Sequence, residues 1–66
     1  MINEEKAQEI ASEYIEQPGA SAGTPILKEI ENNLFVYIVP ILIDEDVRGE
    51  IHIHSKTGEN LGGAGC

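Results

Sequence analysis

The feature that most constrains this fold is an unbroken apolar run of ten residues from Leu34 to Ile43, made up mostly of Ile, Val and aromatic residues. That composition favours a β-strand, and the run is too short to cross a membrane as a helix. Because the side chains of a strand alternate between its two faces, this strand is apolar on both sides. Each face therefore needs a cover.

The sequence predicts one helix near the N-terminus to supply such a cover. Asn3 suits the N-cap of this helix, and Pro18-Gly19 ends it. Between them, apolar residues recur at the spacing of an amphipathic helix: Ala7, Ile10, Ala11, Tyr14 and Ile15.

The rest of the chain has the alternation and composition of β-structure. Strands are predicted at Ile26–Glu31, Leu34–Ile43 and Glu50–His54, and Leu61 is a candidate for a short final strand. Asn32-Asn33 suits a two-residue hairpin, because Asn tolerates positive φ values, whereas 44–49 reads as a longer connection. Residues 17–24 read as a Gly/Ala/Ser-rich loop.

These elements predict an α+β fold, with one N-terminal helix packed on an antiparallel β-meander of three to four strands. Residues 1–61 form a single domain in this reading, and 62–66 form a flexible Gly-rich tail. A chain of 66 residues buries a modest core and is expected to be marginally stable alone.

A two-residue hairpin fixes which side chains share a face of the sheet. It predicts Ile26, Ile30, Phe35 and Val39 on one face, with Tyr37 as a further candidate, and Leu27, Leu34, Val36 and Ile38 on the other. One helix covers one face, so the second face is expected to meet another copy of the chain or a different protein. The alternative is that Pro40 kinks the strand, so that both halves share one core.

The charge balance limits the kind of partner. Twelve acidic against four basic residues give a net charge of −8, which makes nucleic acid and anionic membrane surfaces poor partners and a basic protein surface a favoured one. The polar side of the helix carries Glu5, Glu9, Glu13 and Glu16. We expect Leu34, Val36 and Ile38 to act as apolar anchors, and Glu9 and Glu13 to steer a basic partner. The alternative is that the charge serves solubility alone.

No pattern of a catalytic site occurs at usable spacing, so the chain is predicted to be neither an enzyme nor a cofactor-binding protein. His52 and His54 are weak candidates for a metal site, since they lie on one side of a strand, with Glu50 or Cys66 as a third ligand. Two exposed histidines explain the pattern equally well. Cys66 is the only cysteine, so no disulfide forms within one chain.

Two further expectations concern the ends of the chain. The opening residues lack the basic and apolar regions of a secretory signal, which favours a cytoplasmic location, although a processed mature chain would look the same. Gly62-Gly63 resembles the cleavage site of precursors of modified peptides, with residues 1–63 as the leader. A fraying terminus is the alternative.

Two segments resemble known families. The chain resembles the PepSY domain in its order of helix, loop and antiparallel strands. The resemblance includes the closing segment Glu50–Glu59, which contains a Lys-Thr-Gly turn. The run Pro40–Asp46 followed by Gly49–His52 resembles the YrhB-type immunity proteins. Both resemblances imply a non-catalytic protein-binding role, restraining a peptidase in the first case and neutralising a toxin in the second.

Overall fold

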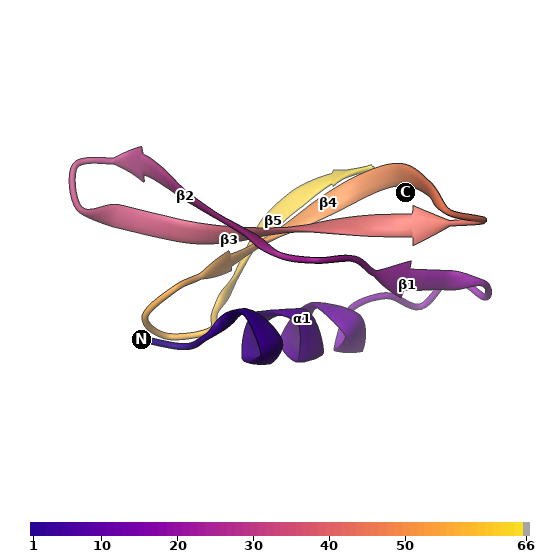
Figure 1. The fold of residues 1–66 in the computed structure, drawn as a ribbon, viewed down its shortest axis with the longest axis horizontal. Coiled ribbons are helices and arrows are strands. Elements are labelled where there is room, and N and C mark those ends of the chain that lie inside the picture. Colours follow the sequence, from indigo (N-terminus) through magenta and orange to yellow (C-terminus); the bar gives the residue numbers. More distant parts are fainter. Residues whose placement is uncertain (66) are drawn as a thin grey trace.

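A computed structural model describes residues 1–65, and in this range the chain forms one helix and one antiparallel sheet of five strands (Figure 1). The elements in chain order are α1 (Glu4–Glu13), β1 (Ala20–Ala22), β2 (Ile26–Glu31), β3 (Leu34–Ile43), β4 (Asp46–His54) and β5 (Asn60–Gly65). The order across the sheet is β1-β3-β4-β5, and β2 also pairs with β3. Strands β1 and β2 therefore follow one another along the same edge of β3.

The predicted α+β class, with a helix on an antiparallel sheet, is confirmed, but the predicted count of three to four strands was too low. The missed strand is β1, whose sequence Ala-Ser-Ala lacks the β-branched and aromatic residues that identify strands. Residues 62–65, expected in a flexible tail, lie in β5 instead. Glycine suits β5 because a Cβ on Gly63 would lie 2.0 Å from the carbonyl oxygen of Glu50. Cys66 lies outside the described residues.

The helix begins at the predicted N-cap. The side chain of Asn3 accepts a hydrogen bond from the backbone N–H of Lys6 (2.8 Å), and Glu4 and Glu5 occupy the first turn, where the helix dipole favours negative charge. Ala7 and Ala11 are fully buried against the sheet. Their small side chains allow the helix to lie close to β3 and β4.

The core lies between α1 and one face of the sheet. The buried residues of this face come from the two central strands: Tyr37, Val39, Ile41, Ile51 and Ile53. The N-terminal segment closes one end of the core, because the N–H of Ile2 donates to the carbonyl of Ser55 (2.7 Å) and the hydroxyl of Tyr37 donates to the carbonyl of Ile2 (3.0 Å). Figure 1 shows α1 on this side of the sheet and no described segment on the other.

The register of β2 differs from the expected one. The two-residue turn at Asn32-Asn33 is confirmed by the pairing of Glu31 with Leu34. However, a bulge between Glu29 and Glu31 shifts the rest of β2 by one position, so Ile26 lies opposite Ile38 and Leu27 lies opposite Tyr37. Because a one-residue shift exchanges the two faces of a strand, the predicted faces of Ile26 and Leu27 were wrong, while the alternation along β3 is as predicted.

The connection between β3 and β4 is a tight turn, not the longer connection that the sequence predicted. Ile43 pairs with Asp46, and the two residues between them, Asp44 and Glu45, have φ values of 52° and 70°. Positive φ at both central residues is the geometry of a type I′ hairpin turn, in which the second position is usually Gly. Glu45 therefore occupies a left-handed conformation that costs about 1 kcal/mol for a residue with a Cβ.

We predict that Glu45→Gly raises the free energy of unfolding by about 0.5–1 kcal/mol, because glycine removes this cost. Urea unfolding followed by circular dichroism measures the change. Glu45→Ala is the matched control, since it removes the same carboxylate but keeps the Cβ. An equal gain from Glu45→Ala would show that charge, not backbone conformation, is responsible.

Candidate binding surface

The sheet face turned away from α1 carries apolar side chains that no other segment of residues 1–65 covers. Alternate residues of β3 point to this side, and the pairs Ile26–Ile38 and Leu42–Val47 extend it onto β2 and β4. We call the following six residues the open face: Ile26, Leu34, Ile38, Pro40, Leu42 and Val47. Five of them form a continuous stripe that runs from Ile26 and Ile38 through Pro40 to Leu42 and Val47, because positions two apart on β3 and directly opposed positions on neighbouring strands are in side-chain contact range. Leu34 is separated from this stripe by the fully buried Val36.

Exposure varies across the open face. The side chains at the two ends of the stripe are the most accessible, with Ile26 at 62% and Val47 at 67%, while the four positions on β3 are half-buried. Val36 also belongs to this side of β3 but is 0% exposed. Its cross-strand neighbours, Lys28 and His54, flank it within the sheet.

The structure separates the residues that the sequence predicted as one partner site. Leu34 and Ile38 are half-buried on the open face, and Val36 has no accessible surface for a partner to contact. Glu9 and Glu13 are exposed on α1, which covers the opposite face of the sheet. The predicted apolar anchors and the predicted acidic residues therefore lie on opposite sides of the sheet and cannot share one contact surface. Alternation along β3 predicted which residues share a face but not which face the helix covers.

Ile26 and Val47 were not among the predicted site residues. Ile26 reaches the open face only because of the bulge in β2, which the sequence pattern did not show. Val47 was placed in a connection, whereas it lies in β4 opposite Leu42. A two-residue turn at Asp44-Glu45 would have predicted this position, because the next strand then starts at Asp46 and includes Val47.

Charge is unevenly distributed between the two sides of the molecule. The open face is bordered by one cation, Lys28, and by two carboxylates, Glu31 and Glu50, because these residues pair in register with Val36, Leu34 and Pro40. Carboxylates concentrate instead on α1 and in the turn around Asp44. The open face is thus close to neutral in a chain whose net charge is −8.

Two histidines border the open face on β4, and each of them has one ring nitrogen in a hydrogen bond. His52 Nε2 is hydrogen-bonded to Glu50 Oε2. His54 Nδ1 accepts a hydrogen bond from the backbone N–H of Lys56 (3.1 Å), so in the neutral ring the proton lies on Nε2. Among residues 1–65, no group of three or more His, Cys, Asp and Glu is placed to hold a metal ion. The proposed third ligand Cys66 lies outside the described residues.

We predict that zinc does not raise the melting temperature of the protein, because residues 1–65 place no group of three ligands together and because His54 would have to give up its hydrogen bond from Lys56 to bind zinc through Nε2. A site with a dissociation constant one hundredth of the free zinc concentration would add about 2.7 kcal/mol, which differential scanning fluorimetry detects. Cys66→Ser is measured in parallel. A rise in both proteins would contradict the prediction and establish a site at His52 and His54, which a His52→Gln variant should then abolish.

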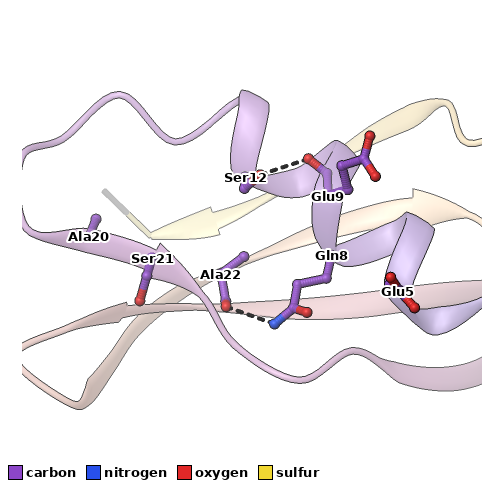
Figure 2. A pocket seen from close by; sticks show the side chains of 7 residues that line it. All are labelled: Glu5, Gln8, Glu9, Ser12, Ala20, Ser21 and Ala22. Atoms are coloured by element: carbon purple, nitrogen blue, oxygen red, sulfur yellow. Dashed lines mark hydrogen bonds between the residues drawn. The ribbon is translucent and has the colours of Figure 1, made fainter.

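A second, more polar surface is a groove of about 540 Å³ between α1 and β1. Figure 2 shows its lining, which consists of Glu5, Gln8, Glu9, Ser12, Ala20, Ser21 and Ala22. Gln8 ties the two elements together, because its side-chain amide donates to the carbonyls of Ala22 (3.0 Å) and Gly23 (2.9 Å). The groove is therefore part of the junction that attaches the helix to the edge of the sheet.

The position of Gln8 has a physical cause on the neighbouring strand. The N–H of Gly23 donates to the carbonyl of Pro40 (2.8 Å), and an ordinary residue at 40 would return a hydrogen bond to the carbonyl of Gly23. Proline has no N–H, so that carbonyl lacks a donor in the ladder. The amide of Gln8 supplies the missing donor.

We predict that Gln8→Ala lowers the free energy of unfolding by about 1–2 kcal/mol, because it leaves two part-buried carbonyls without their donor. Glu9→Ala is the matched control in the same groove. It removes only an exposed contact with Lys6 (3.5 Å) and should change stability by less than about 0.5 kcal/mol.

A double-mutant cycle tests the role of Pro40 directly. In a Pro40→Thr background the new N–H can donate to Gly23, so the loss caused by Gln8→Ala should fall. An unchanged loss would show that Gln8 acts independently of the proline.

Comparisons with protein-family models, with curated proteins and with solved structures find no match for this chain. The resemblances to the PepSY and YrhB-type families thus depend on the residues quoted for them. In the part of the chain that the structure describes, no helix is long and apolar enough to cross a membrane.

Proposed function

We propose that this chain is a small, non-catalytic protein-binding module, whose open face docks against another protein chain. The observation that supports the proposal is the one-sided cover of the sheet: α1 packs against the Tyr37 side, and an apolar stripe from Ile26 to Val47 remains on the other. Contiguous apolar surface of this kind marks interaction sites in folded proteins.

The free energy available at the open face is large enough to matter. Fully burying an Ile or Val side chain is worth about 1.5–3 kcal/mol. Ile26 and Val47 are each about two-thirds exposed, so covering both contributes roughly 2–4 kcal/mol before the half-buried residues between them are counted. That contribution corresponds to a change in affinity of roughly 30- to 1,000-fold.

The acidic residues of α1 would act on a partner through long-range electrostatics, because they lie away from the open face. Glu9 and Glu13 lie on the far side of the sheet, where they add to the long-range field of a chain with a net charge of −8. Such a field speeds the encounter with a basic protein without requiring direct contacts. An inhibitory role, as in a peptidase-restraining or toxin-neutralising protein, is the form of this function that the two resemblances support.

The alternative of a modified-peptide precursor gains no specific support from the fold. Gly62 and Gly63 lie within β5, and Gly63 pairs with Ile51 on β4. A protease that cuts after Gly63 would first have to separate β5 from the sheet.

Photo-crosslinking at matched positions tests the proposal. A benzophenone amino acid is placed at Ile26 or Val47 on the open face, or at Ser12 in α1 or the exposed Glu16 after its end, in the cells that make the protein. We expect covalent adducts with a protein chain at positions 26 and 47 to exceed those at 12 and 16 by about tenfold or more, the ratio that 1.4 kcal/mol of preference gives. Equal yields at all four positions would overturn the proposal.

A further inference from the structure

We infer that the occupant of the open face is a second copy of this chain, packed sheet against sheet in a symmetric dimer. This inference rests on the proposed function, because it names the partner of the same surface. Three properties of the described residues support it: the distribution of charge, the area of the face and the small size of the core.

Charge decides which surface two copies can share. Each chain has a net charge of −8, so any surface rich in carboxylates repels its own copy. The open face is bordered by one Lys and two Glu, whereas α1 carries Glu4, Glu5, Glu9 and Glu13 against Lys6. A contact through the open face therefore brings together the least charged surfaces of the two molecules.

The layer geometry also keeps the acidic helices apart. Two sheets pack about 10 Å from each other, and each helix lies about 10 Å beyond its own sheet, so the helices of a face-to-face dimer are about 30 Å apart. This distance exceeds three Debye lengths at physiological ionic strength, where one length is about 8 Å. The repulsion between the two helices is consequently screened. A contact through α1 would instead place the same carboxylates within about 10 Å of each other.

The broad side of the molecule is close in size to a standard dimer interface. The chain has 4356 Å² of accessible surface, and a standard interface takes about 800 Å² from each partner, roughly one fifth of this total. The molecule measures 35 × 18 × 16 Å, so its broad side has a projected area of roughly 600 Å², and a corrugated surface has a larger accessible area than its projection. Reaching a standard interface therefore requires contact across the broad side, along the whole stripe from Ile26 to Val47.

Dimerisation would also complete the burial of the central strand. Among the residues whose burial the structure describes, the buried apolar cluster under α1 contains seven, two of them alanine. Small cores of this kind are commonly stabilised by association. Sheet-on-sheet packing turns Leu34, Ile38, Pro40 and Leu42, which are half-buried in one chain, into the centre of a second apolar layer.

Sedimentation velocity over about 10–500 μM of the purified full chain tests the inference, since this range brackets the affinity of a modest interface. We expect a concentration-dependent shift from monomer to dimer. Ile26→Glu should weaken the dimer by at least about tenfold, because it places a carboxylate in the contact. Leu27→Glu is the matched control: it adds the same charge at the adjacent position of the same edge strand, but on the helix side, and should change the affinity by less than about threefold.

Salt and melting curves add two independent readouts. Because the contact is apolar and the chains repel each other, raising NaCl from about 0.05 to about 0.5 M should increase the dimer fraction. The melting temperature should rise with protein concentration for the unsubstituted chain and not for Ile26→Glu. A dimer that salt dissociates, or that Ile26→Glu leaves intact, would overturn the inference.

The remaining outcomes separate this inference from the proposed function. A chain that stays monomeric at all concentrations, yet forms position-dependent crosslinks to a different protein through residues 26 and 47, overturns the second copy and leaves the binding function standing. A monomer with equal crosslinking at every position overturns both.

Discussion

The packing of α1 against one side of β3 is the interaction on which the rest of this molecule depends. Ala7 and Ala11 are fully buried, and because their side chains are small the helix lies close to Tyr37, Val39 and Ile41. Once these alternate residues are covered, the residues between them must face the other way. The same contact that builds the core thereby creates the open face.

The edge of β3 shows how the fold accommodates a proline in its central strand. Pro40 would ordinarily be confined to an edge, yet here β4 pairs on one side and β1 and β2 share the other. The carbonyl of Gly23, left without a ladder donor, is satisfied by Gln8 from the helix. The missing N–H of Pro40 thus leaves a carbonyl to which α1 is hydrogen-bonded through Gln8. The groove in Figure 2 lies at this contact between α1 and β1.

The separation of charge from apolar surface gives the molecule two different sides. The helix side and the turn around Asp44 carry most of the carboxylates, whereas the open face is nearly neutral. Most of the charge and the uncovered apolar stripe therefore lie on different sides of the sheet. The rings of His52 and His54 lie at the border of the open face, and each is held there by one hydrogen bond.

The sequence by itself determined the start of the helix and two of the strands, because their signals are local: the helical stripe from Ala7, the cap at Asn3, the strands at 26–31 and 34–43, and the alternation within β3. It also predicted that one apolar face would lack a helix. Only the tertiary structure decided the rest. The bulge in β2 exchanged Ile26 and Leu27, β1 and β5 joined the sheet despite poor β-propensity, and Glu9 and Glu13 came to lie on the side opposite Leu34 and Ile38. These outcomes depend on long-range pairing and on which face the helix covers, and neither is encoded in the residues of any one segment.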